Sequence, residues 1–272
     1  PGRMSRYTHT CVLRLLLVCV AASSSGSVRV SAPRAVSPLE ATSRERGISP
    51  LLGWLDRRLA RWRRRNRPKR IILVRHGESI GNVNSSAYSS TPDSQISLTE
   101  RGFEQGTACG REIRRLVGNG SVRFYYSPYL RVRQTLLAIL QAFEGQPVEI
   151  ASEPRLREQD FGNFQDPLSM SRLREDRMKF GRFFFRFPNG EAGTDVFDRV
   201  SDFISTLFAH FDSGERRRTA DNCVLMTHGL LMRIFSMCYF HWTVSEFEQV
   251  WNPSNCEIWV LEKVPRTGRY RR

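Results

Sequence analysis

The chain has few cysteines, and their spacing matches no common cysteine-based fold. Six occur among 272 residues, two near the start and the others at Cys109, Cys223, Cys238 and Cys256. None forms the close pairs typical of zinc sites, and four scattered thiols do not make a disulfide framework. With 40% hydrophobic residues, the chain can instead bury a sizeable core in one large domain or two small ones.

The sequence also lacks an apolar run long enough to span a bilayer comfortably. The longest, "CVLRLLLVCVAA", follows a short basic start and is interrupted by Arg14. Small residues follow it, so residues 1–26 are predicted to be a signal-like leader. Residues 27–47 are rich in Ser, Ala and Arg, which suits either a transit peptide or a disordered spacer. The leader predicts the secretory pathway or a plastid, and a cytoplasmic location is the alternative.

Most of the chain has almost no net charge, although its total is +15. Residues 1–70 hold 16 of the 42 basic residues and only 3 of the 27 acidic ones, which leaves 26 basic and 24 acidic residues for the remainder. No recognised nucleic-acid motif accompanies the basic segment. A nucleic-acid partner is therefore not predicted.

Residues 51–66 carry a helical pattern within the basic linker of residues 27–67. Leu51, Leu55, Leu59 and Trp62 fall on one face, and arginines fill the others. Such a helix can lie on an anionic membrane surface, and it can equally pack on the folded domain or act as a solvated linker.

The stretch "RIILVRHGESIGN" brings charged residues directly to the end of an apolar run. Residues 71–74 are uninterrupted aliphatic residues, as in a strand that is covered on both faces. Arg75, His76 and Glu78 follow at once, with Gly77 permitting a tight turn. Ligands of parallel sheets bind beyond the carboxyl ends of strands, and a cation beside an imidazole suits an anionic substrate.

Strand and helix patterns alternate over the rest of the chain. Strands are predicted at residues 123–127, 148–152, 223–227 and 257–264. The helix at 98–117 has Thr99 as its expected N-cap, and Ser97 with Glu100 also fits a capping box. The fold class is α/β, a three-layer α/β/α sandwich with a mostly parallel central sheet. Residues 161–188 are less regular and are predicted to form a helical insertion or lid.

Three further strand ends carry chemically useful side chains. Arg131 lies in the first turn of the helix after "YYSP", Glu158 follows the strand at 148–152, and Thr227 and His228 end the strand at 223–227. Carboxyl ends of parallel strands meet at one sheet edge, so these residues are expected to join Arg75 and His76 there.

Five sequence blocks together resemble the histidine phosphatase superfamily, also called phosphoglycerate-mutase-like. They are "LVRHGES" with Asn82, "SPYLRVRQT", "LREQDFG", "PNGEAGTDVFDRV" and "VLMTHG". Within the superfamily, the stretches "RPKRIILVRHGES" and "LREQDFGNFQ" resemble plant phosphoglycerate-mutase-like proteins and fungal broad-range acid phosphatases. The resemblance places the domain at residues 68–264, followed by a basic tail at 265–272.

The resemblance implies a role for each strand-end residue. The catalytic set is His76 as the nucleophile that becomes phosphohistidine, Glu158 as the proton donor and acceptor, and Arg75, Arg131 and His228 around the phosphate. Arg75, Arg131 and His228 would also bind substrate, together with Asn82 and Thr227. The two arginines keep the imidazole neutral and offer forks that match phosphate geometry. No metal and no cofactor are implied.

Several neighbouring polar residues are expected to support the site without reacting. Glu78 would orient the loop after the histidine, and Arg133 would face a salt bridge or solvent. Glu191, Asp195 and Arg199 would fix the insertion against the core.

The predicted function is hydrolysis of a small phosphorylated substrate. A mutase is the alternative, although "FGNFQDPLSMSR" replaces the basic pattern that mutases carry after the glutamate. A non-catalytic scaffold is the other, although all five catalytic side chains are present. An acidic optimum is expected because Glu158 must be protonated to act as an acid.

Overall fold

The computed structural model describes residues 58–59, 64, 66–213, 220–265 and 267–272. The predicted leader at 1–26, the transit-like segment and most of the helical pattern at 51–66 lie outside these ranges and stay predictions. The helices within them include none that is long and apolar enough to cross a membrane.

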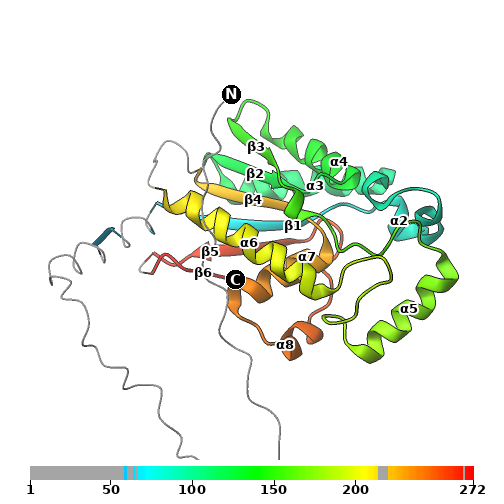
Figure 1. Cartoon of the computed structure of the whole chain (residues 1–272). Coiled ribbons are helices and arrows are strands. Elements are labelled where there is room, and N and C mark those ends of the chain that lie inside the picture. Colours follow the sequence, from blue (N-terminus) through cyan, green and yellow to red (C-terminus); the bar gives the residue numbers. More distant parts are fainter. Residues whose placement is uncertain (1–57, 60–63, 65, 214–219, 266) are drawn as a thin grey trace, which may run out of the picture. The chain divides into compact units, whose positions relative to one another are not determined.

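A six-stranded sheet forms the centre of the described domain, in the order β3-β2-β4-β1-β5-β6 (Figure 1). Its strands are β1 Arg70–Arg75, β2 Val122–Tyr126, β3 Val148–Ser152, β4 Asn222–Thr227, β5 Ile258–Lys263 and β6 Tyr270–Arg271. The pairs among β1, β2, β3 and β4 are parallel, whereas β5 runs antiparallel to β1 and β6 to β5. The prediction of a mostly parallel sheet is confirmed.

Helices cover both faces of this sheet. The helices are α2 Ile80–Val83, α3 Glu100–Val117, α4 Leu130–Leu140, α5 Pro167–Phe180, α6 Gly193–Asp212, α7 Gly229–Phe240 and α8 Val244–Gln249. Helices α3 and α4 pack together on one face, and α6 and α7 pack on the other (Figure 1). Side chains of a strand alternate between faces, so Ile72 and Val74 join the α3/α4 core while Ile71 and Leu73 join the α6/α7 core. These two cores define the predicted three-layer sandwich.

The loop after β1 lies directly on the first turn of α3. Thr99 caps this helix as expected, its hydroxyl accepting from the Gly102 N–H at 3.1 Å. A Cβ added to Gly77 would lie 2.4 Å from the Gly102 carbonyl oxygen, so only glycine permits this approach. The backbone beside His76 is thereby fixed to a rigid helix.

The predicted insertion is helical, and its helix α5 stands apart from both helical layers (Figure 1). Helix α5 follows Asp166, whose carboxylate accepts from the Ser169 N–H at 2.8 Å as an N-cap. Met170 is the only buried residue of α5. The described residues also form four 3₁₀ turns. Two lie between α2 and α3, η1 Ser85–Ser89 and η2 Asp93–Gln95; η3 Gln141–Phe143 follows α4, and η4 Pro154–Leu156 follows β3.

The end of the chain belongs to the sheet rather than to a basic tail. Tyr270 and Arg271 form β6, which pairs Tyr270 with Lys263 and Arg271 with Glu262. The Tyr270 hydroxyl donates to the Pro68 carbonyl at 2.8 Å, and its ring is buried in the α6/α7 core. Residues 270 and 271 of the predicted basic tail at 265–272 thus form a strand, which the sequence could not reveal because two residues have no periodicity.

Candidate active site

The residues at the carboxyl ends of the strands line one cavity of about 280 Å³. Its wall contains Arg75, His76, Asn82, Arg131 and Glu158, which the sequence predicts to meet. The other lining residues are Gly81, Tyr88, Asp93, Phe161, Gln165, Met170, Arg174, Arg177, Phe187 and Asn252. Thr227 and His228 lie behind this wall.

His76 is buried in a form that leaves one ring nitrogen available to attack. Its Nδ1 lies 2.7 Å from the Gly77 carbonyl oxygen, which can only accept, so Nδ1 carries the proton. Nε2 then keeps a lone pair and accepts from Arg131 Nε at 3.3 Å. Burial, followed by the charges of Arg131 and Arg75, holds the pKa of His76 well below its usual value. The imidazole is therefore neutral, as a nucleophile requires.

Arg131 connects the two histidines of the site. Its guanidinium is 3% exposed, and its Nη1 donates to both the carbonyl and the carboxylate of Asp93 at 2.7 Å. Its Nη2 lies 3.3 Å from His228 Nδ1. The ion pair with Asp93 orients the Arg131 guanidinium, whose Nε donates to His76.

His228 lies against His76 and is fully buried. A guanidinium only donates, so Nδ1 accepts from Arg131 and the ring proton resides on Nε2, 2.9 Å from Ser127 Oγ. The two imidazole rings meet edge to face with centroids 5.2 Å apart. Burial, then Arg131 and His76, lower the pKa of His228 well below its usual value. Both nitrogens are engaged here, so a direct contact between His228 and phosphate remains a prediction.

Thr227, predicted to bind substrate, lies outside the cavity wall. Its side chain is fully buried, and its hydroxyl donates to the Leu156 carbonyl at 2.8 Å. This contact ties the end of β4 to the segment that carries Glu158. In this structure the hydroxyl positions the neighbouring backbone, and a contact between Thr227 and substrate stays a prediction.

Arg75 and Asn82 present donors to the cavity from the β1 end. Arg75 Nη1 donates to the Pro253 carbonyl at 2.6 Å, while its buried Nε has no partner. The Asn82 carboxamide oxygen accepts from the Ser79 N–H and from Asn255 Nδ2, both at 3.1 Å. This arrangement leaves the Asn82 –NH₂ group as its donor toward a ligand.

Glu158 is held in the cavity wall in an environment that favours its protonated form. Its Oε1 accepts from the Gln159 N–H at 3.0 Å, and withdrawal from solvent raises its pKa. The Gln159 contact and the charge of Arg131 oppose this rise but do not cancel it. A carboxyl with a raised pKa in a cavity lined by arginines is suited to deliver a proton.

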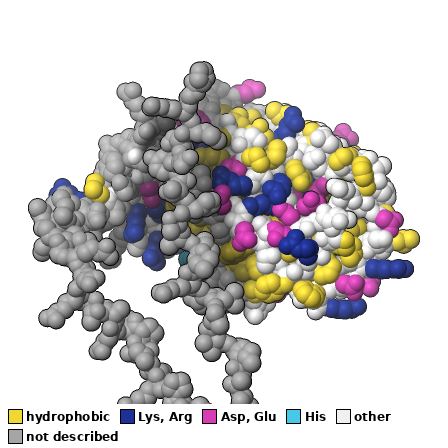
Figure 2. All heavy atoms as spheres, in the orientation of Figure 1, with side chains coloured by type: hydrophobic (Ala, Val, Ile, Leu, Met, Phe, Trp, Pro, Cys, Tyr) yellow, Lys and Arg dark blue, Asp and Glu magenta, His cyan; other side chains and the backbone are white. Residues whose placement is uncertain are grey.

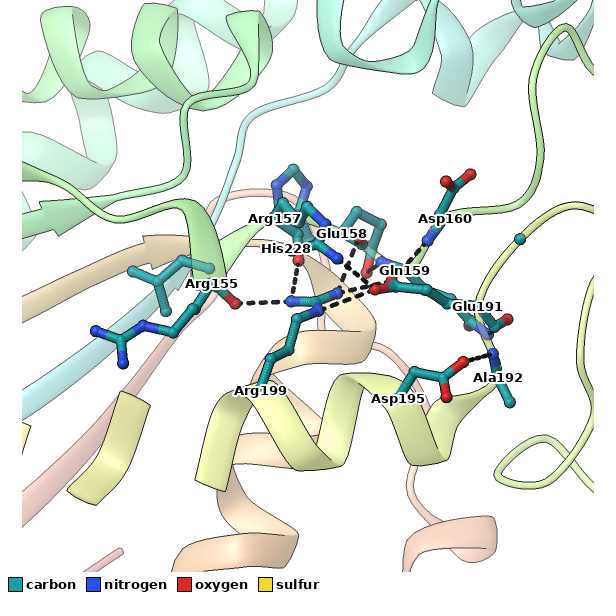
Figure 3. A network of polar contacts seen from close by, with 12 residues as sticks. Arg155, Arg157, Glu158, Gln159, Asp160, Glu191, Ala192, Asp195, Arg199 and His228 are labelled. Carbon is teal, nitrogen blue, oxygen red and sulfur yellow. Dashed lines mark hydrogen bonds and ion pairs between the residues drawn. The ribbon is translucent and has the colours of Figure 1, made fainter. Parts of the chain in front are cut away.

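A polar network anchored on α6 positions the backbone of Glu158 (Figure 3). Arg199 donates to the carbonyls of Arg155 and Arg157 at 2.7 and 2.9 Å and to that of Glu158 at 3.1 Å. It also pairs with Glu191 at 3.0 Å, and Glu191 accepts from the Asp160 N–H. Arg199 thus fixes three carbonyl groups in the four-residue segment that ends at Glu158.

Replacing Arg199 with Met is expected to weaken both stability and the alignment of Glu158. The loss of three buried carbonyl contacts should lower the free energy of unfolding by about 1–3 kcal/mol, measured in urea. Arg111→Met, at an exposed position on α3, is the control and should stay within about 0.5 kcal/mol of the parent. If Arg199→Met does not fold, Arg199→Lys is the second variant, and it is expected to retain stability but to have a lower kcat. A kcat equal to that of the parent protein in every folded Arg199 variant would contradict this role.

Glu78 and Arg133 lie outside the cavity wall. The Glu78 carboxylate accepts from the Thr99 hydroxyl at 2.9 Å and pairs with Arg101 at 3.4 Å, so it holds the loop to α3. Arg133 is exposed on α4. Within the described ranges, no group of three or more His, Cys, Asp or Glu side chains could hold a metal ion.

Sequence reasoning missed the cavity residues that come from loops and from the insertion. The polar ones among them are Tyr88, Asp93, Gln165, Arg174, Arg177 and Asn252. The spacing of Arg174 and Arg177 places both on one helix face and could have signalled a shared role. No local pattern points to the others.

Comparison with known proteins assigns the family. The model of the histidine phosphatase superfamily (branch 1) matches residues 71–272. The chain belongs to the histidine phosphatase superfamily. It is 44% identical to the phosphoglycerate mutase-like protein AT74H of Arabidopsis thaliana, over 75% of this chain and 76% of that protein.

Two other similarities within the superfamily concern enzyme class and fold. The broad-range acid phosphatase DET1 of Saccharomyces cerevisiae is 31% identical over 75% of this chain and 88% of its own length. A solved structure titled mycobacterial hydrolase 1 has the same fold, with a TM-score of 0.58 and 22% identity over 75% of this chain and 95% of that one. The predicted family and fold are confirmed, and relatives of the chain include a named phosphatase.

Proposed function

We propose that the protein hydrolyses small phosphomonoesters through a phosphohistidine at His76, without a metal ion. The observation that carries the proposal is the His76 imidazole, which is neutral and has its Nε2 lone pair facing Arg131 in the cavity. Arg75 and Glu158 line the same cavity and supply a second cation and an acid.

In the first proposed step, His76 Nε2 attacks phosphorus while the P–O bond to the alcohol breaks. Arg75 and Arg131 donate to the non-bridging oxygens and stabilise the charge that develops on them. Glu158 gives its proton to the departing oxygen, so the alcohol leaves neutral and the carboxylate remains. The phosphoryl group is then bonded to His76.

In the second proposed step, water attacks phosphorus and the P–N bond breaks. The Glu158 carboxylate takes a proton from the attacking water, which restores the acid for the next cycle. Inorganic phosphate leaves, and the lone pair returns to Nε2. Each side chain ends as it began.

The full chain assayed with a panel of small phosphomonoesters in the presence of EDTA tests this proposal. Phosphate release should persist with the chelator. The alternative is mutase-type transfer, which the name of the mutase-like plant relative favours. Isomerisation of phosphoglycerate with no phosphate release would replace the hydrolase with the mutase; loss of activity with EDTA would contradict metal independence.

Activity is expected to be highest on the acidic side of neutrality. Glu158 must be protonated for the first step, and its raised pKa keeps it protonated up to a higher pH than an ordinary carboxyl. His76 must be neutral, and its lowered pKa keeps it neutral down to a lower pH than an ordinary histidine. The rate of phosphate release should therefore fall as the pH rises through the pKa of Glu158. A pH–rate profile that increases into the alkaline range would contradict these assignments.

A further inference from the structure

Helix α5 adds two arginines to the cavity beyond the proposed catalytic group. Arg174 and Arg177 are three residues apart and therefore project from one side of the helix. Met170 lies on the same side, one turn earlier, and it is both the buried residue of α5 and part of the cavity wall. This side of α5 is thus the one that faces the site, and its two cations face it too.

Neither guanidinium is neutralised by a carboxylate among the described residues. Arg177 Nη2 contacts only neutral acceptors, the Gln159 side chain at 3.2 Å and the Arg182 carbonyl at 3.5 Å, and its buried Nε has no partner. Arg174 forms no ion pair with any residue that the structure describes. The acidic Asp176 of the same helix pairs with Lys179 instead, at 3.7 Å.

The positive charge at Arg177 is partly withdrawn from solvent. Burial lowers its pKa, with Glu158 opposing and the neighbouring Arg182 lowering it again. Burying an unpaired charge is unfavourable, and such arrangements persist where a ligand compensates for them. The Arg177 guanidinium also lies over the Phe187 ring, 5.4 Å from its centroid, which holds the fork at the cavity wall.

The charges around the cavity exceed what one phosphate requires. Four arginines line it, against the two carboxyl groups of Asp93 and Glu158, and Asp93 is already paired with Arg131. Behind the wall, Arg233 is 2% exposed and donates to Asn252 Oδ1 and the Phe247 carbonyl, which adds a further cation with no carboxylate contact. The transferred phosphate would use Arg75 and Arg131, leaving the α5 arginines for another anion.

We infer that Arg174 and Arg177 form a second anion subsite, so that the preferred substrate is a small phosphomonoester with a second anionic group. This inference rests on the proposed phosphatase function. Guanidinium forks bind carboxylate and phosphate alike, so either can be the second group. The cavity volume of about 280 Å³ fits a metabolite rather than a macromolecule. Phe161 and Phe187 line the same cavity and can pack on the carbon skeleton between the anions.

Two matched substrate pairs test the subsite with the full chain. 3-Phosphoglycerate and glycerol 1-phosphate differ by a carboxylate, and fructose 1,6-bisphosphate and fructose 6-phosphate differ by a phosphate. The parent protein is expected to have a kcat/KM about tenfold or more higher for the member with two anionic groups in at least one pair, because that member makes added charge-assisted contacts. The pair with the larger ratio identifies the second group as carboxylate or phosphate.

Arg174→Gln and Arg177→Gln should remove this preference selectively. Each is expected to lower kcat/KM for the preferred substrate with two anionic groups by about tenfold, mainly through KM, and to change that for the counterpart with a single phosphate by less than about twofold. Arg172→Gln is the matched control because Arg172 is exposed on the same helix and absent from the cavity wall. It should leave both ratios unchanged.

The outcomes separate this inference from the function on which it rests. If the parent protein hydrolyses both members of each pair equally well, or the α5 variants lower both members equally, the subsite is overturned and the phosphatase stands. If no ester is hydrolysed, the proposed function fails. Calorimetric titration with 3-phosphoglycerate then decides the subsite: binding weakened by Arg177→Gln but not by Arg172→Gln supports it, and any other result overturns it.

Discussion

His76→Asn is expected to lower kcat/KM for phosphomonoester hydrolysis by about 10³- to 10⁶-fold, the range seen when a catalytic nucleophile is removed. Asparagine has no nitrogen lone pair that can attack phosphorus, so the first step has no substitute in the cavity. The remaining arginines would still bind phosphate, so the loss should fall on kcat rather than on substrate affinity. Steady-state phosphate release and calorimetric binding of inorganic phosphate measure the two effects separately.

His241→Asn is the matched control for this substitution. His241 is exposed at the end of α7 and has a positive φ of 57°, a conformation that asparagine tolerates well. Activity of this control should equal that of the parent protein. A His76→Asn variant that is folded by circular dichroism and retains a tenth or more of the parent kcat would refute the proposed nucleophile.

Glu158→Gln is expected to lower kcat by about 10²- to 10⁴-fold for alkyl phosphates, whose leaving groups need a proton. For p-nitrophenyl phosphate the loss should be much smaller in the first step, because p-nitrophenolate leaves without protonation. Glutamine keeps the size and polarity of the side chain but cannot transfer a proton. Comparison of phosphoenzyme formation rates for the two substrates measures the difference.

The alkaline fall in the pH–rate profile should also disappear in Glu158→Gln, because the group that titrates has been removed. Asp160→Asn is the control, since Asp160 is an exposed carboxylate two residues further along the same segment and outside the cavity wall. An equal loss for both leaving groups would show that Glu158 supports the site without donating a proton.

Local patterns were sufficient to predict the central strands and the residues at their ends. The aliphatic run at 71–74 has no exposed side chain, and its alternate residues enter the two cores, as a doubly covered strand requires. Parallel strands bring their carboxyl ends together, so Arg75, Arg131 and Glu158 could be placed together without coordinates. β6 could not be predicted, because a strand of two residues is defined only by its partner β5.

The cavity wall beyond the strand ends depends on tertiary packing that no local pattern encodes. Asp93 lies in the 3₁₀ turn η2, and its pairing with Arg131 links segments 38 residues apart. Thr227 shows a second limit of sequence reasoning. Its position at the end of a strand is correctly predicted, but the sequence does not reveal that its hydroxyl donates to the Leu156 carbonyl. The sequence determines which residues reach the sheet edge, and the packing around them determines which ones face the cavity.

The most direct test of the account is to quench the reaction of the full chain with a ³²P-labelled phosphomonoester within one turnover and locate the label. The predicted result is a phosphate attached to His76 that is stable in alkali and lost in acid, and that forms and decays fast enough to account for turnover. Phosphate release at the normal rate with no label on His76, or with the label on another residue, would contradict the account.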